Sequence, residues 1–191
     1  MSEHFLIFFS AAVVTNFVLV YFLGLCPVIG VTNKSATGFR LGLATTFVMV
    51  LASIAAWAMN FVLVRAPYLR IIAFIVAIAS IVQLVELFIK KFSPSLYREL
   101  GIFLPLIASN SQVLLLAIFQ TNRGYTLTQG LAFAAGGGLG ITAVLAIVGI
   151  LRERLEFAPI PPVARGPALV FMIVAALSLV FMGFAGMGSA A

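Results

Sequence analysis

The chain has 191 residues, of which 63% are hydrophobic and only 8% are charged, and its mean hydropathy is +1.23. Soluble globular domains carry about 25% charged residues, so this composition excludes a soluble globule and predicts an all-α integral membrane protein. The net charge of +6 needs no nucleic-acid partner, because the basic residues that produce it fall in the predicted loops.

Six stretches with almost no charge are each close to the roughly 20 residues that an α-helix needs to cross a bilayer. They are residues 4–33, 41–64, 71–89 (interrupted only by Glu86), 100–122, 124–151 and 166–191. We therefore expect one membrane domain over residues 1–191, with six transmembrane helices and both termini on the same side. The first stretch lacks a basic segment before it, so we interpret it as a retained helix rather than a signal peptide.

The first span contains the single cysteine, Cys26, followed directly by Pro27. A proline inside a helix removes a hydrogen-bond donor, and we expect Pro27 to interrupt this span. A broken transmembrane helix persists only where protein or an internal cavity covers the freed polar groups. The expected cover is a partner, a cofactor or a second broken helix. Alternatively, Cys26 is simply a small apolar side chain.

Two further spans resemble each other. Residues 42–52 of the second span are similar to residues 138–148 of the fifth at an offset of 96, and Thr15-Asn16 is matched by Ser109-Asn110 at an offset of 94. The pattern predicts two three-helix repeats, residues 1–95 and 96–191, inserted with opposite orientation. In such proteins interrupted helices meet near the midplane and form the functional site. Here these would be the first and fourth helices, with Pro27 and Pro105.

Polar and small residues inside the later spans have competing interpretations. Glu86 either pairs with Lys90 one turn later or serves as a cation ligand. The polar run of residues 109–112 is costly in a span unless it lines a site or satisfies a broken backbone. The glycines of residues 136–140 superficially suggest a phosphate loop. Because no Lys-Ser/Thr follows, we expect them to permit close helix packing instead.

The basic residues predict the orientation of the chain. One set of loops carries eight of them: Lys34, Arg40, Lys90, Lys91, Arg98, Arg152, Arg154 and Arg165. The other set carries Arg65, Arg70 and Arg123. The positive-inside rule places the first set in the cytoplasm and both termini outside, which is the periplasm for a bacterial inner membrane protein.

Several chemistries are excluded by what the chain contains. The connections are too short for a nucleotide-binding βαβ unit of about 30 residues. The one histidine, His4, cannot provide paired axial ligands to a haem, and one thiol cannot hold an iron–sulfur cluster alone. We expect no complete active site, and no haem, nucleotide or flavin, in this chain alone.

Five segments resemble the RnfA/NqrE family, whose members are membrane subunits of the Rnf complex and of the sodium-pumping quinone reductase. They are residues 23–27, 42–49, 97–107, 150–155 and 181–184, so the resemblance extends almost from end to end.

The resemblance implies one subunit of a multi-subunit translocase and oxidoreductase, paired with an RnfE-like sibling subunit near other subunits that carry flavin and iron–sulfur centres. It implies a [2Fe–2S] cluster shared between the siblings, which relays electrons across the membrane centre and is coupled to cation translocation. Cys26 matches one cysteine of the family and would be the metal ligand. Ser111 stands at the position of the second cysteine, where an oxygen is a harder ligand for ferric iron than a thiolate.

Two questions stay open from the sequence. Asn16, Thr46 and Asn110 are predicted to line an ion path. The competing function is a cofactor-free subunit, either structural or transporter-like, because Ser111 replaces the second cysteine.

Overall fold

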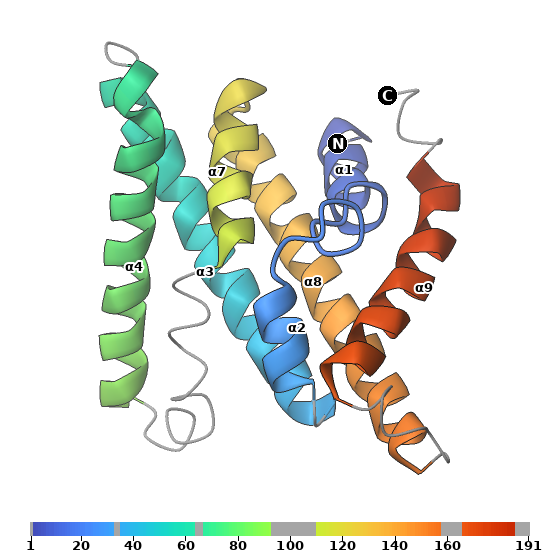
Figure 1. The fold of residues 1–191 in the computed structure, drawn as a ribbon. Helices are drawn as coiled ribbons and strands as arrows, with labels where there is room; N and C mark the ends of the chain where they lie inside the picture. The colour runs from blue at the N-terminus through green and yellow to red at the C-terminus, as the bar shows by residue number, and fades with distance from the viewer. Residues whose placement is uncertain (1, 33–34, 64–66, 93–109, 158–165, 186–191) are drawn as a thin grey trace.

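The computed structural model describes residues 2–32, 35–63, 67–92, 110–157 and 166–185, and these residues form helices joined by turns, with no strand. The prediction of an all-α chain is therefore confirmed for this part of the molecule (Figure 1). The helices are α1 (Ser2–Phe9), α2 (Leu25–Val31), α3 (Ser35–Leu63), α4 (Arg70–Phe92), α7 (Ser111–Asn122), α8 (Leu127–Glu156) and α9 (Pro167–Ala185). A π-helical turn, η1 (Ser10–Val14), follows α1, and a 3₁₀ turn, η2 (Pro67–Leu69), precedes α4.

Two of these helices contain segments long and apolar enough to cross a membrane, namely Ser35–Asn60 in α3 and Leu127–Leu155 in α8. Three shorter apolar segments, Glu3–Val14, Ile71–Leu87 and Pro167–Gly183, accompany them. The described part of the chain thus contains two clear candidates for spans. Pro105 and Ser109, which belong to the predicted fourth span, lie outside the described residues.

The centre of the fold is the antiparallel pair α3 and α8, which pack against each other through glycines. A Cβ atom at Gly42 would lie 2.7 Å from the Cα of Thr142, and one at Gly138 would lie 2.8 Å from the Cα of Thr46. Between these two contacts, the hydroxyl groups of Thr46 and Thr142 are 3.2 Å apart. Only glycine lets the two backbones approach this closely, because a methyl group at either position would overlap the facing helix.

The other glycines of the 136–140 run confirm that this segment serves packing. A Cβ at Gly136 would meet the carbonyl of Phe8, one at Gly137 would meet the ring of Phe17, and one at Gly140 would meet the carbonyl of Ala12. Successive glycines thus face different neighbours around α8. The segment is a helix interior and not a phosphate-binding loop.

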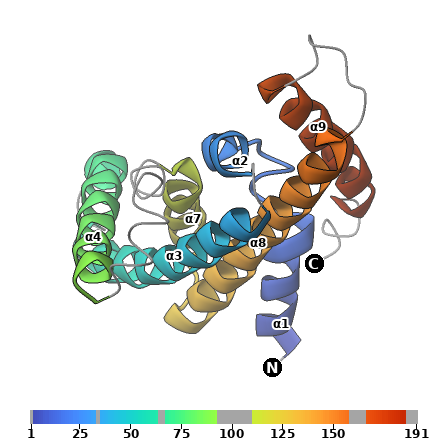
Figure 2. The ribbon, with the colours of Figure 1, turned by 90° about the horizontal axis from the view of Figure 1, so that it is seen from below.

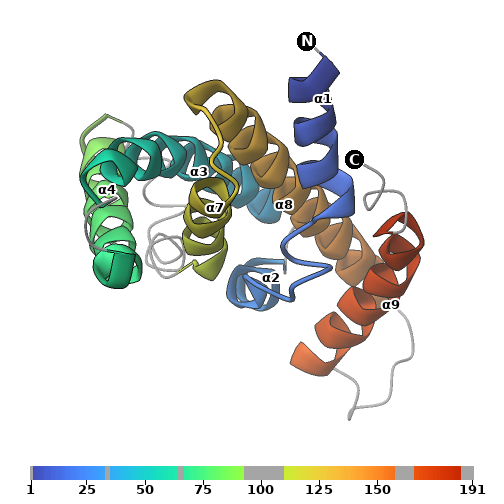
Figure 3. The ribbon, with the colours of Figure 1, turned by 90° about the horizontal axis from the view of Figure 1, so that it is seen from above.

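The remaining helices surround this pair. Figure 1 shows α4 beside α3 at one side of the molecule and α9 beside α8 at the other. Figures 2 and 3 both place α2 and α7 on one side of the α3–α8 pair, whereas α1 begins on the opposite side. The start of α1 and the end of α9 lie at the same end of the molecule (Figure 1).

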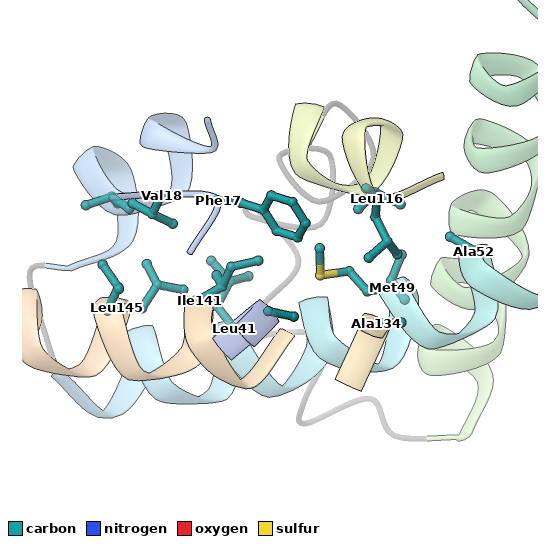
Figure 4. Packing of buried hydrophobic residues seen from close by; sticks show 14 of the residues in the cluster. Phe17, Val18, Leu41, Met49, Ala52, Leu116, Ala134, Ile141 and Leu145 are labelled. Carbon is teal, nitrogen blue, oxygen red and sulfur yellow. The ribbon is translucent and has the colours of Figure 1, made fainter. Parts of the chain in front are cut away.

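Buried side chains fill the space between the α3–α8 pair and the elements on its α2 and α7 side. Phe17 and Val18, from the segment after η1, lie over Ile141 and Leu145 of α8, and Leu116 of α7 lies over Met49 of α3 (Figure 4). The outward faces of α4 and α9 are instead apolar and exposed, as helices facing hydrocarbon require. The exposed residues include Ile72, Val76 and Leu84 on α4, and Met172, Leu179 and Val180 on α9.

The predicted first span is interrupted, but at a position other than Pro27. The helical turns of α1 and η1 end at Val14, residues 15–24 form turns, and a new helix begins at Leu25. Pro27 therefore lies in the first turn of α2, where its missing N–H has no intrahelical acceptor to lose. The prediction that Pro27 breaks the helix was wrong, because the break precedes it.

Two adjacent charged residues near the C-terminal end of α8 bind the ends of two other helices. The Arg152 guanidinium donates to the Ile29 carbonyl of α2 (3.2 Å) and to the hydroxyl of Thr32 (3.3 Å). The Glu153 carboxylate accepts from the backbone N–H of Ser35 (2.7 Å) and from its hydroxyl (3.1 Å). A carboxylate at the start of α3 satisfies an orphan N–H and interacts favourably with the helix dipole.

Candidate functional site

Cys26 is the second residue of α2, and its thiol is exposed on the surface of the chain. The residue before this helix, Gly24, has φ of +74°, a left-handed conformation that glycine adopts without strain. Pro27 and Val28, which follow the cysteine, are buried. The backbone therefore turns at Gly24, and the buried Pro27 and Val28 hold α2 against the core. Cys26 remains exposed.

Ser111 is the first residue of α7, and its side chain is also exposed. The preceding residue, Asn110, caps the helix by accepting a hydrogen bond from the N–H of Gln112 at 3.1 Å. Asn16 forms the same local bond in the first span, where its side-chain oxygen accepts from the N–H of Val18 at 3.0 Å. The two asparagines, matched at an offset of 94, thus make equivalent turns after similar Thr-Asn and Ser-Asn sequences.

A buried side chain connects the starts of α2 and α7. The Gln112 side-chain amide is fully buried and donates a hydrogen bond to the carbonyl of Leu23. It also lies against Gly24, where any Cβ atom would overlap the amide. The structure therefore brings the neighbourhoods of Cys26 and Ser111 together, although these residues are 85 positions apart in the chain (111 − 26).

The residues of the predicted ion path are satisfied by separate partners. The amide of Asn16 donates to the Gly140 carbonyl (3.2 Å), whereas Thr46 bonds Thr142 and the Gly42 carbonyl. Asn110 donates to the side chain of Gln112 at 3.3 Å. None of these hydrogen bonds connects Asn16, Thr46 or Asn110 to another of the three residues. The ion path therefore stays a prediction.

The non-helical segment before α2 carries large apolar and aromatic residues that are exposed on the surface of the chain. Val20, Tyr21 and Phe22 are all exposed, and Phe22 has φ of +53°. Ser178 of α9 satisfies one carbonyl of the segment by donating to Leu19 at 2.7 Å. Non-helical backbone at membrane depth requires protein cover, so this face is suited to contact with another polypeptide.

Whether a metal cofactor can bind at the junction of α2 and α7 depends on the side chains available as ligands. Among the described residues no three of His, Cys, Asp and Glu gather in one place. At the junction of α2 and α7 the chain offers one thiol and one hydroxyl, both outward. A group completed by a second protein fits this arrangement, since both donor residues are exposed rather than buried in the chain's own core.

The sequence predicted Cys26 and Ser111 as donors, and these assignments stay predictions. It did not predict the contact between Gln112 and Gly24. The polar run of residues 109–112 was recognised as costly in a span, which was the available signal for a buried amide. Nothing in the sequence showed that its acceptor would be a carbonyl 89 positions earlier.

Taken together, the helices and their exposed apolar faces define a membrane protein built around a close helix crossing. The family described as Rnf-Nqr subunit, membrane protein, matches residues 4–188. The chain belongs to this family.

Three relatives extend the comparison. The chain is 47% identical over 191 residues to the A-type subunit of the ion-translocating oxidoreductase complex of Syntrophotalea carbinolica. It is 44% identical over 190 residues to the subunits of the same description from Serratia proteamaculans and Yersinia pseudotuberculosis. In each case the similarity covers 98% of this chain and 98% of the relative.

Proposed function

We propose that the chain is the A-type membrane subunit of an ion-translocating oxidoreductase complex, and that it contributes Cys26 and Ser111 to a [2Fe–2S] cluster shared with a sibling membrane subunit. The observation that carries this proposal is the meeting of two distant helix starts, each with an outward-facing donor. The relatives of similar length, which bear the name of such a subunit, support the assignment to the complex.

The side chains of this protein would have distinct tasks at the shared site. The Cys26 thiolate would bind iron directly, and Ser111 would offer an oxygen ligand in place of a second thiolate. The bound cluster would supply one-electron transfer. Pro27 and Val28 anchor the cysteine from the buried side, and the exposed residues 20–22 would exclude lipid and water by contacting the sibling subunit.

The same proposal includes six spans in two inverted repeats. It is supported by the Thr46–Thr142 contact, whose partners are 96 positions apart, and by the matched glycines Gly42 and Gly138 on either side of it. An offset of 96 relates Gly42 to Gly138 and Thr46 to Thr142, so it converts the Gly42–Thr142 contact into the Gly138–Thr46 contact. A twofold relation between two repeats requires such an exchange.

The proposed orientation places both termini in the periplasm of a bacterial inner membrane. We expect a reporter fused after Arg154 to be active in the cytoplasm and one fused at Ala191 to be active outside. The physical reason is the eight-to-three distribution of basic residues between the two sets of loops. Activity of the Ala191 fusion in the cytoplasm would contradict an even number of spans after an external N-terminus.

Ser111 favours a second candidate, a cofactor-free subunit with a structural or transporter-like role, because an alkoxide is a less suitable ligand for a ferric cluster. Electron paramagnetic resonance of the purified, reduced complex separates the two. We expect a [2Fe–2S] signal that disappears when this subunit is omitted, and iron below stoichiometric amounts in the isolated chain. An iron signal that stays unchanged when this subunit is omitted from the complex would favour the cofactor-free role.

A further inference from the structure

Helix α7 carries two buried glutamines that bind backbone carbonyls of the first half of the chain. Gln112 is 0% exposed and Gln120 is 2% exposed, and they are eight residues apart. Gln112 donates to the carbonyl of Leu23, and Gln120 donates to the carbonyl of Ser53 at 3.1 Å. Both are buried amides of the same type, but only Gln112 contacts the segment that leads to Cys26.

The orientation of the Gln112 amide is fixed from both sides. Its oxygen accepts a hydrogen bond from the Asn110 side chain at 3.3 Å, which directs the nitrogen towards Leu23. Its flat face lies against Gly24, whose φ of +74° and missing side chain leave just enough room. The amide therefore holds one conformation, and the turn before α2 is shaped around it.

The bonded carbonyl belongs to non-helical backbone, so it has no helical partner to return to if the amide is lost. Leu23 is three residues before Cys26, and Gln112 directly follows Ser111. One side chain thus joins the two segments that carry the predicted donors. The Leu23 carbonyl is partly buried, whereas the Gln112 amide is fully buried, so breaking this bond would leave a buried amide donor unpaired at a cost in free energy.

We propose that Gln112 is a positioning residue that, through Leu23 and Gly24, fixes the Cys26 thiol relative to Ser111. The link between this positioning and a shared metal cluster rests on the proposed function. The positioning of the thiol itself does not depend on a cluster. Loss of the amide donor frees the turn that precedes α2, so the thiol samples more orientations. Gln112 does not bind the group itself.

The test compares Gln112→Met with Gln120→Met in the full chain, purified in detergent micelles. Methionine has a similar length but no amide, so each variant removes one bond donated to a backbone carbonyl and one bond accepted from a side chain. Because Cys26 is the only cysteine, the rate of labelling by a maleimide reports this thiol alone. We expect about a fivefold faster reaction in Gln112→Met, the ratio expected from one lost hydrogen bond, and an unchanged rate in Gln120→Met.

In the assembled complex, Gln112→Met should also shift the resonance signal or the reduction potential of the cluster, and Gln120→Met should not. Equal labelling rates in the wild-type chain and in Gln112→Met, or equal increases in both variants, would overturn the proposal. If Gln112→Met does not fold, Gln112→Asn keeps a polar amide that is too short to reach Leu23 and should show the same increase. A wild-type complex without a cluster would refute the proposed cofactor, while the labelling rates would still decide the role of Gln112.

Discussion

Cys26→Ala is expected to abolish electron transfer through the complex and the resonance signal of the shared cluster. The substitution removes the one thiolate that the chain can offer, and the remaining donor at Ser111 is a weakly acidic hydroxyl, which is a poor substitute for the thiolates that hold iron–sulfur clusters. Activity of purified complexes and their iron content measure the effect. The cost to folding should be small, because the Cys26 side chain is exposed and leaves no internal cavity.

Ser111→Cys is the matched variant, since it restores a soft ligand at the neighbouring helix start. We expect it to increase the yield of iron per complex and to shift the reduction potential, without loss of assembly. Unchanged electron transfer in Cys26→Ala would eliminate a redox role for this chain and leave the cofactor-free alternative.

Gly138→Val is expected to destabilise the fold by about 2–3 kcal/mol or to prevent it from forming, because the new side chain would overlap backbone atoms of Thr46 at the centre of the α3–α8 crossing. Backbone atoms cannot move aside as a flexible side chain can, so the two helices would have to separate. Loss of the Thr46–Thr142 contact would follow. Thermal unfolding in detergent, followed by size-exclusion chromatography, measures the change.

Gly183→Val is the control for this substitution. Gly183 is also a helical glycine, but a Cβ atom there would meet no other atom within 4 Å. We expect its melting temperature to stay near that of the wild-type chain. If Gly138→Val were as stable as Gly183→Val, the close crossing would not be the structural centre of the molecule.

The sequence predicted the helical class and the close packing through glycines correctly, because both depend on local composition. Apolar stretches of sufficient length have few alternatives to a helix, and residues 136–140 lack the side chains of a phosphate loop. The similarity of residues 42–52 and 138–148 also had a physical basis, since these segments face each other and share the Thr46–Thr142 contact.

The interruption of the first span was harder to predict. Pro27 was the strongest local signal, yet a proline is tolerated in the first turn of a helix, and where that turn begins depends on Gly24. Gly24 also lies against the Gln112 amide, which is distant in sequence and leaves no room for a side chain at this position. Propensity rules describe neighbours along the chain, whereas this contact is with a neighbour in space.

The hydrogen bonds made by Arg152 and Glu153 of α8 form late during synthesis of the chain. Glu153 satisfies Ser35 across 118 positions, and Arg152 satisfies Ile29 across 123. At roughly 5–20 residues per second, a ribosome needs on the order of ten seconds to add the intervening residues. Until α8 has been synthesised, α2 and α3 lack both the partners at their ends and the helix that packs on Gly42. The first half of the chain can therefore complete these contacts only late in synthesis.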